Sequence, residues 1–536
     1  MKKILLCSLL FILIFLTACT KGQKEYQVEV DDMLKENLID DNYRVFYQIF
    51  IGSFSDSNND GIGDLQGIIN RLDYLNDGIP NSGKSLGIEG IWLSPMMPSP
   101  SYHKYDVTNY YEIDSKFGDL ETFRELIRIT QDRNIKVIID LVVNHTSEWH
   151  PWFRAFKKAI EENDMESPYR EYYSYVTANE RDLNKIYYQV HSGSNYYYEA
   201  NFSSSMPELN FDNPSVREAF KDIIEFWLNL GVSGFRLDAT KYVYMHETEK
   251  NIEFWNWFMD EAKKINPDVY VIGETWSSQN EMLPYYEPFN NFDFEFSQLQ
   301  GLISQAAMVS MSVNSFTKAL ETYQNKVMDI RSDAILSPFI SNHDMDRSAG
   351  YLSVEDGIMQ MAANFLLLSP GNPYIYYGEE IGLKGSRGNA NTDANRRLAM
   401  LWGDNDKISD PVGTTYPEAS QTSNTVKKSL SDETSLYNHY KKLIMLRKAN
   451  PEIARGIYVA LNYSERDTFG GSLSTYNGST IAIFHNSGIR ELVIDLSLYT
   501  DIQFQTLRGY VGQGDATLSD DGHTLTISGL TSVVLK

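Results

Sequence analysis

Eight short apolar runs, rich in Val, Ile, Phe and Tyr, follow one another along the chain, separated by segments long enough to form helices. Runs that are apolar at consecutive positions are typical of parallel strands, because both faces of such strands are buried. No other feature constrains the fold as much as this alternation. The predicted strands lie near Arg44–Phe54, Gly87–Met97, Lys136–Val143, Val232–Asp238, Val269–Glu274, Phe292–Phe296, Ala334–Ser341 and Pro373–Tyr377.

Amphipathic helices are predicted between most of these strands. Within Asp119–Arg133 four residues share one helical face, namely Phe123, Leu126, Ile127 and Thr130. Pro214–Leu230 begins with proline, which favours the first position of a helix. Eight strands joined by helices predict an α/β fold, a (β/α)8 TIM barrel. The alternative is an open doubly wound sheet, but no glycine-rich phosphate loop follows the first strand.

Two stretches depart from the barrel pattern. Residues 146–207 are rich in Tyr, Asn, Ser and Glu without barrel periodicity, which indicates an inserted subdomain after strand three. After Pro451, short alternating strands separated by Gly, Asn and Asp predict a C-terminal antiparallel β-sandwich, over 451–536. We expect this domain to shield the barrel. The barrel itself is predicted over 42–145 and 208–450.

The N-terminus looks like a targeting segment. A positive start, Met1–Lys3, precedes an apolar run that is short for a membrane span, so 1–18 is predicted to be a signal peptide. Leu16–Cys19 resembles a bacterial lipobox, which implies lipidation of Cys19, a polar tether over 19–41, and an extracellular, membrane-anchored location. The alternative is an ordinary secretion signal with an incidental Cys. The other cysteine, Cys7, lies in the removed segment, so the mature chain has no disulfide.

Four carboxylates stand at the C-terminal ends of predicted strands: Asp140, Asp238, Glu274 and Asp344. Strand ends of a barrel meet at one rim, so these acids are expected to converge. Such a cluster serves either a metal or glycoside cleavage. A metal cluster would need several His at ligand spacing, whereas only His145 and His343 accompany the acids. Glycoside cleavage needs one ionised and one protonated carboxyl, and it accounts for more of these residues.

The overall charge excludes one class of partner. The net charge is −25, with 47 Lys and Arg against 72 Asp and Glu. Nucleic-acid binding depends on cations that contact phosphates, so we expect no nucleic-acid partner. We expect a monomer.

The four acids stand in four short motifs, Asp140–His145, Gly234–Tyr242, Gly273–Trp276 and Phe339–Asp344. With these motifs, the chain is similar to the α-amylase family, glycoside hydrolase family 13, from about Asn42 to the C-terminus. The resemblance implies that Asp238 is the nucleophile, held ionised by Arg236, and that Glu274 is the general acid and base. Asp344 would stabilise the transition state. Two histidines, His145 and His343, would bind sugar hydroxyls, and Asp140 would be structural.

Further segments strengthen the resemblance. Tyr102–Asp106 resembles a family segment in which Tyr105 stacks on the sugar, while His103 and Asp106 bind hydroxyls. Lys104 replaces the usual Gly, which marks a position of positive φ. Met206–Asn210 resembles the segment that ends the insertion, with Glu208 in place of Asp. Asp393 and Arg397 resemble a pair that closes the glycone subsite.

The loop Asp56–Asp64 places oxygen-bearing side chains at alternate positions around Gly61, as hard cations require. By resemblance to related enzymes, it implies a Ca²⁺ cofactor. The alternative is an Asx-rich turn without metal. The implied ligands are Asp56, Asn58, Asp60, Asp64 and the Ile62 carbonyl.

Three positions bear on substrate choice. Ala239 after the nucleophile resembles members that cut α-1,4 bonds, and Lys241 matches a residue on the leaving-group side in α-amylases. Tyr242 departs from the usual His. The prediction is a retaining α-amylase acting on starch-derived glucans and maltooligosaccharides. The alternatives are an α-glucosidase, a neopullulanase-like enzyme, a 4-α-glucanotransferase, or a non-catalytic glucan-binding protein at the cell surface.

Overall fold

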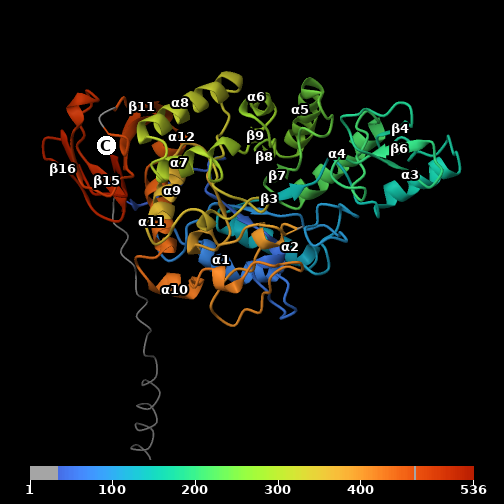
Figure 1. Ribbon diagram of the computed structural model, residues 1–536, viewed down its shortest axis with the longest axis horizontal. Coiled ribbons are helices and arrows are strands. Elements are labelled where there is room, and N and C mark those ends of the chain that lie inside the picture. Colours follow the sequence, from blue (N-terminus) through green and yellow to red (C-terminus); the bar gives the residue numbers. More distant parts are fainter. Residues whose placement is uncertain (1–33, 391, 464–465) are drawn as a thin grey trace, which may run out of the picture.

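The catalytic core is a curled parallel sheet. The computed structural model describes residues 34–390, 392–463 and 466–536, and in these residues seven strands pair in parallel in the order β10-β1-β2-β3-β7-β8-β9 (Figure 1). The strands span β1 Phe46–Ile49, β2 Gly90–Leu93, β3 Lys136–Leu141, β7 Gly234–Leu237, β8 Tyr270–Gly273, β9 Asn290–Asn291 and β10 Tyr374–Tyr376. The predicted TIM barrel is confirmed.

The gap between β9 and β10 is filled by the segment Ala334–Ser341, which was predicted to be a strand. It forms one parallel bridge, from Phe339 to Tyr374. The backbone N–H of Tyr374 also donates to the carbonyl of Pro338, at 2.9 Å. Proline has no N–H and cannot continue a ladder. The prediction of a regular strand was therefore wrong, although the segment occupies the eighth position of the barrel.

The predicted strand Phe292–Phe296 was also wrong. The strand β9 ends at Asn291, and Phe294–Phe296 forms a 3-10 turn. Beyond β9 the backbone N–H of Asp293 donates to the carbonyl of Ser337 at 3.2 Å, and the fully buried Asp293 carboxylate accepts from the Ser337 N–H at 2.6 Å.

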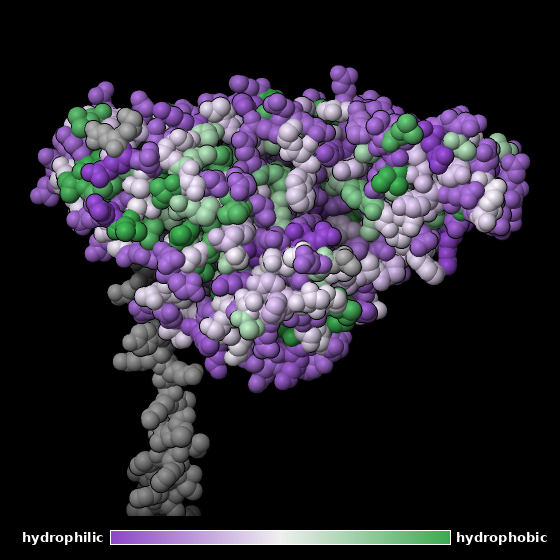
Figure 2. Space-filling view, viewed as in Figure 1, coloured by the Kyte–Doolittle hydropathy of each residue, from purple (hydrophilic) through white to green (hydrophobic). Residues whose placement is uncertain are grey.

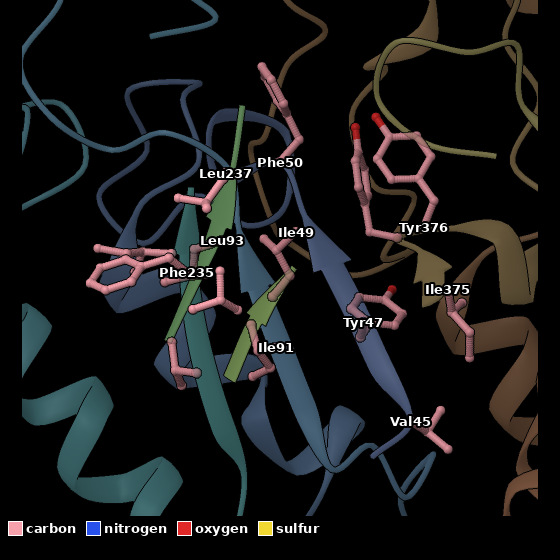
Figure 3. Close-up of a cluster of buried hydrophobic side chains, with 14 of the residues drawn as sticks. Val45, Tyr47, Ile49, Phe50, Ile91, Leu93, Phe235, Leu237, Ile375 and Tyr376 are labelled. Carbon is pink, nitrogen blue, oxygen red and sulfur yellow. The ribbon is translucent and has the colours of Figure 1, made fainter. Parts of the chain in front are cut away.

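Side chains of the barrel strands alternate between two layers. From β1 and β2, Phe46 and Trp92 point into the barrel and pack in its interior cluster. Their neighbours Tyr47, Ile49 and Ile91 belong to the outer layer under the helices (Figure 3). This alternation is the period of two of a β-strand, with both faces buried.

Helices cover the outside of the barrel. The predicted α2 and α4 are confirmed: α2 is capped by Asp119, which accepts from Thr122 N at 2.8 Å, and α4 begins at Pro214. The helices span α1 Leu65–Leu75, α2 Leu120–Asp132, α4 Pro214–Asn229, α5 Thr248–Ile265, α6 Gln279–Met282, α7 Leu302–Ala307, α8 Val313–Ile330, α9 Ile358–Leu367, α10 Val426–Ser431 and α11 Leu436–Ala449.

The segment after β3 forms the predicted insertion, which lies outside the barrel sheet. It contains the helix α3 (Pro151–Glu161) and a small antiparallel sheet ordered β4-β6-β5, which lies to the right in Figure 1. These strands are Tyr175–Thr177, Tyr196–Glu199 and Tyr187–Gln189. The two ends of the insertion meet at a bridge between His145 and Glu208.

The C-terminal domain is antiparallel. A five-stranded sheet has the order β11-β12-β13-β18-β15, and a three-stranded sheet has the order β14-β17-β16. Their facing sides enclose a separate hydrophobic cluster. Hydrophobic residues also gather on the surface over this domain, on the left of Figure 2. The elements are α12 Glu452–Arg455, β11 Ile457–Ala460, β12 Phe469–Tyr476, β13 Ser479–Asn486, β14 Leu492–Asp495, β15 Leu507–Gly512, β16 Ala516–Leu518, β17 Thr524–Ile527 and β18 Thr531–Leu535.

The predicted signal peptide and Cys19 lie outside the described residues. The last part of the predicted tether does not hang free: Asn37 N donates to Lys448 O at 2.9 Å, and Arg455 contacts Asp41 at 2.7 Å. This part of the tether is therefore attached to the barrel at Lys448 and to the C-terminal domain at Arg455. In the described residues, no helix is long and apolar enough to cross a membrane.

Candidate active site

A cavity of about 810 Å³ opens at the C-terminal ends of the barrel strands. It brings together residues that lie between Ser101 and Arg397 in the sequence, as the convergence of strand ends requires. Of the predicted site residues, those that line it are His103, Tyr105, His145, Asp238, Glu274, Asp344, Asp393 and Arg397. Those that do not are Asp106, Asp140, Arg236, Lys241 and His343.

Arg236 organises three of the four carboxylates from beneath the cavity. This side chain is fully buried, and its Nη1 lies 2.8 Å from both Asp140 Oδ1 and Asp238 Oδ1. Its Nη2 lies 2.7 Å from Glu274 Oε2. Asp238 and Glu274 therefore contact adjacent nitrogens of one guanidinium, whose planar geometry fixes their relative position.

The carboxyls of this rim differ in protonation. Burial, reinforced by Asp238 and Asp344 against the opposing charge of Arg236, raises the pKa of Glu274 to about 8. Although burial acts in the opposite direction, the pKa of Asp344 falls to about 2 through His343, Arg397 and Arg236. The cavity thus presents a protonated and an ionised carboxyl at neutral pH, which is the pairing that acid–base catalysis requires.

Asp140 lies behind the cavity and accepts hydrogen bonds from side chains next to it. Its Oδ2 accepts hydrogen bonds from Tyr105 at 3.0 Å and from the indole N–H of Trp92 at 3.2 Å. Burial raises the pKa of Asp140 to about 7. With Arg236 these contacts fix the ring of Tyr105, which lines the cavity, so Asp140 orients the rim.

His343 is a neutral hydrogen-bonding link. Gln48 Nε2 donates to its Nδ1 at 2.7 Å, so the ring proton resides on Nε2. That nitrogen lies 2.6 Å from the Tyr105 hydroxyl and 3.0 Å from Asp344 Oδ2. Burial lowers the pKa of His343 to about 3, which keeps it uncharged. His343 therefore positions Asp344 and Tyr105 from outside the cavity.

Arg397 closes one end of the cavity. Its Nη2 lies 2.6 Å from Asp344 Oδ1 and 3.8 Å from Asp393 Oδ2, and its Nη1 donates to the Tyr102 hydroxyl at 3.0 Å. Asp106 is held nearby by the Ser99 hydroxyl, at 2.6 Å. Buried ion pairs with several hydrogen bonds define a rigid wall.

His145 has an unpaired nitrogen at the cavity. The side chain is 1% exposed, and its Nε2 has no hydrogen-bond partner among the described residues. Burial lowers the pKa of His145, so the ring is neutral. An unpaired buried nitrogen costs free energy unless a ligand completes its hydrogen bond. The Nε2 atom of His145 is therefore available for a hydrogen bond with a hydroxyl group of a ligand.

The residue before Tyr105 has a backbone conformation that favours Gly. Lys104 has φ of 67°, which is unfavourable for a side chain other than Gly. Its Nζ forms a buried ion pair of 2.6 Å with Asp114 and donates to Ser99 O at 3.0 Å. These contacts offset the backbone strain.

Several cavity residues were not predicted to have a role. Tyr102 lies beside Arg397, and Phe202 from the insertion packs against Tyr242, with ring centroids 4.7 Å apart. Trp276 stacks on Phe294 at 5.1 Å. Trp276 could have been found from its place two residues after Glu274, and Tyr242 from its departure from the family pattern. Phe202 has no comparable signal.

The predicted calcium loop is held by its own backbone. Asp56 accepts from Asn58 N at 3.0 Å and from Gly61 N at 2.8 Å, and Asp64 caps α1 through Gly67 N at 2.6 Å. Asn58 and Asp60 accept from the backbone two residues further on. In the described residues, no three His, Cys, Asp or Glu side chains converge as a metal site. The oxygen donors suit a hard cation in kind, and Ca²⁺ binding with the Ile62 carbonyl stays a prediction.

Comparisons with known proteins agree with this geometry. The model of the alpha amylase catalytic domain matches residues 48–456. The chain is 37% identical to Alpha-amylase 3 of Dictyoglomus thermophilum, over 82% of this chain and 84% of that protein. It is 32% identical to the 4-alpha-glucanotransferase of Thermotoga neapolitana, over 65% of this chain and 74% of that protein. The solved structure of Eubacterium rectale Amy13B matches with a TM-score of 0.84 and 36% identity, over 94% of this chain and 96% of that chain. The chain therefore belongs to the α-amylase family of glycosidases.

Proposed function

We propose that this enzyme is a retaining hydrolase of α-1,4-linked glucans. The observation that carries the proposal is the placement of Asp238 and Glu274 on one guanidinium, with the pKa of Glu274 raised to about 8. In a retaining mechanism the two carboxyls stand about 5 to 5.5 Å apart, and one acts as nucleophile while the other carries a proton.

The reaction has two steps. Asp238 attacks the anomeric carbon while the proton of Glu274 passes to the leaving glycosidic oxygen, which produces a glycosyl–enzyme ester. The carboxylate of Glu274 then takes a proton from water, and the resulting hydroxide displaces Asp238. Arg236 stabilises the carboxylate of Asp238 in both steps through its 2.8 Å contact.

The remaining cavity residues bind the sugar on the glycone side. Asp344 is held ionised beside Arg397 and would bind hydroxyls more strongly as the ring gains positive charge. The unpaired Nε2 of His145 would hydrogen-bond a hydroxyl of the same sugar. His103 and Asp393 line the same cavity, where Tyr105 would stack on the ring.

Starch-derived glucans and maltooligosaccharides are the proposed substrates. Ala239, directly after the nucleophile, has φ of 50° and leaves the cavity open beside Asp238. Similarity to a protein named Alpha-amylase 3 supports hydrolysis, and similarity to a 4-alpha-glucanotransferase supports glycosyl transfer as the second candidate.

Product analysis on starch, pullulan and maltotriose tests the proposal. We expect new reducing ends and maltooligosaccharides from starch, with retained α-configuration in the first products by NMR. A chain that binds starch and produces no reducing ends would be a glucan-binding protein. Glucose as the sole product would instead indicate an α-glucosidase, and inversion at the anomeric carbon would exclude Asp238 as nucleophile.

We further propose that the mature protein is a monomer tethered at a bacterial cell surface by a lipid on Cys19. The support is the lipobox-like Leu16–Cys19 segment. Mass spectrometry of the mature N-terminal peptide would detect the lipid. The variant Cys19→Ala should move the enzyme from the membrane fraction into the medium, and retention on the membrane would contradict the anchor.

A further inference from the structure

Lys104 lies in a loop whose neighbouring side chains line the cavity. Tyr102, His103 and Tyr105 are all lining residues, whereas Lys104 is not. Its side chain is 4% exposed and points away from the cavity into the protein. Its backbone has φ of 67°, a conformation that a residue other than Gly keeps only when its surroundings hold it there.

The ammonium group of Lys104 is held by groups that are fixed to the barrel. Its Nζ lies 2.6 Å from Asp114 Oδ2 and donates to Ser99 O at 3.0 Å. Asp114 is itself fixed, because its backbone N–H donates to Met96 O at 2.8 Å, just beyond the end of β2. Both side chains of the ion pair are buried, so the loss of one would leave a buried charge without its partner. The pair therefore ties the middle of the loop to the end of a barrel strand.

Two of the cavity-lining residues in this loop have their own contacts outside it. The Tyr102 hydroxyl accepts from Arg397 Nη1 at 3.0 Å. The Tyr105 hydroxyl donates to Asp140 Oδ2 at 3.0 Å. These two rings would keep their places even if the backbone between them became mobile.

His103 has no such contact. Among the residues that the structure describes, its ring is hydrogen-bonded only within the loop, to Tyr105 N and Ser101 Oγ, both at 3.2 Å. Burial and the charge of Arg397 lower the pKa of His103, so the ring is neutral. Its Nδ1 accepts from Tyr105 N, which places the ring proton on Nε2 as a donor. The position of this donor therefore depends on the backbone at Lys104.

We propose that Lys104, through its ion pair with Asp114, is a positioning residue that fixes His103 for a hydrogen bond to the glycone sugar. Gly at this position would reach the same φ without cost but would also sample others. A Lys with a buried anchor keeps one conformation, so less entropy is lost when the sugar binds. This inference deepens the proposed function and rests on its assignment of His103 to the glycone side.

Steady-state kinetics of Lys104→Gly with maltoheptaose test the proposal. We expect KM to rise about tenfold, the size of one hydrogen bond, while kcat stays within about twofold. This split is expected because the contact to the sugar is made both before and in the transition state. An unchanged KM would overturn the positioning role.

Two further variants separate the ion pair from the backbone angle. Lys104→Asn adopts positive φ more readily than most residues but cannot reach Asp114, so KM should rise as in Lys104→Gly. A normal KM in Lys104→Asn would show that the backbone angle alone suffices and would overturn the role of the pair. Val309→Gly is the matched control, because Val309 has φ of 58° and does not line the cavity. Its KM should not change, and an equal rise there would also count against the proposal.

A double variant shows whether Lys104 acts through His103. His103→Ala alone should raise KM about tenfold, and adding Lys104→Gly should raise it no further, because both changes remove the same hydrogen bond. A purely structural role of Lys104 would multiply the two effects to about a hundredfold. That outcome would overturn the link between the two residues.

Calorimetry distinguishes failure of this inference from failure of the proposed function. In the Asp238→Asn background, Lys104→Gly should raise the Kd for maltoheptaose about tenfold whether or not the unmodified protein cleaves it. Binding without any cleavage by the unmodified protein would refute the proposed function alone. Cleavage together with an unchanged Kd would refute the positioning role alone.

Discussion

The cavity rim and the contact between the barrel and the C-terminal domain both bury polar side chains, but they differ in how completely these side chains are hydrogen-bonded. At the rim, His145 Nε2 and Asn144 Oδ1 have no partner among the described residues. At the contact, the amide of Asn364 donates to Val511 O at 3.0 Å and to Ser532 Oγ at 2.9 Å. Its carbonyl lies 2.8 Å from His439 Nε2.

This difference separates a binding region from a supporting one. Unpaired buried atoms lower stability until a ligand completes their hydrogen bonds. The fully paired hydrogen-bond network around Asn364 instead stabilises one arrangement of the two domains. Substitutions at the rim are therefore expected to change chemistry with little effect on folding. Substitutions at the domain contact are expected to do the reverse.

The largest effect is expected from Asp238→Asn. Without the nucleophile, turnover should fall by at least about 10⁴-fold, because the covalent step is lost. Glucan binding, measured by calorimetry with maltoheptaose, and the melting temperature should change little. Residual turnover near that of the unmodified enzyme would show that another group attacks the sugar.

The domain contact is tested by Asn364→Ala. Loss of its amide removes the hydrogen bonds to Val511 O, Ser532 Oγ and His439 Nε2, at a cost of about 3 kcal/mol in the free energy of unfolding. Urea denaturation measures this loss, and kcat at low temperature should stay unchanged. The exposed Asn70→Ala is the matched control. An equal effect of both variants would remove the distinction between the regions.

Changes in pH should affect the two regions on opposite sides of neutrality. The pKa of Glu274 is about 8, so kcat/KM should fall above pH 8 as this acid loses its proton. Burial lowers the pKa of His439 to about 4 and of His485 to about 3, from 6.5.

Both histidines bind protons more readily in the unfolded chain, so stability should decrease as pH falls from about 6.5 toward 4. Melting curves between pH 7 and 4 measure this decrease. His439→Gln, which keeps an N–H donor without a titrating group, should flatten the dependence. An unchanged slope in this variant would assign the acid sensitivity to other groups.

The smallest effect is expected from calcium removal. If the loop Asp56–Asp64 holds Ca²⁺, excess EDTA should lower the melting temperature by a few degrees, and added Ca²⁺ should restore it, because a ligand stabilises the folded state that binds it. Asp60→Ala should abolish the response to EDTA. Identical melting curves with and without EDTA would favour a metal-free Asx turn.

Much of the fold and the rim could be predicted because barrel strands and their terminal acids follow simple patterns. Asp238 and Glu274 stand one residue beyond β7 and β8, as their apolar runs indicate. The irregularity of Ala334–Ser341 could have been suspected from Pro338, whereas its contact with the distant carboxylate of Asp293 could not be predicted from the sequence.

The aromatic contact that lines the cavity at Phe202 could not be predicted from the sequence either. Phe202 lies in an insertion without periodicity, and its contact with Tyr242 joins residues from separate parts of the fold. The direction of Lys241 depends on Ser277, which no local pattern indicates. Such pairings arise from tertiary structure, so the sequence suggested the reacting groups better than their surroundings.

Arg236 has a consequence for the conditions under which the enzyme works. Its charge and those of the acids around it are buried together, and dissolved ions do not reach between them. Salt screens exposed charges over about 10 Å at 0.1 M but affects buried pairs much less. The proposed substrate is uncharged, so ionic strength should matter little to its capture. We therefore expect kcat/KM for maltooligosaccharides to stay nearly constant from dilute buffer to molar NaCl, an independence that steady-state kinetics can verify.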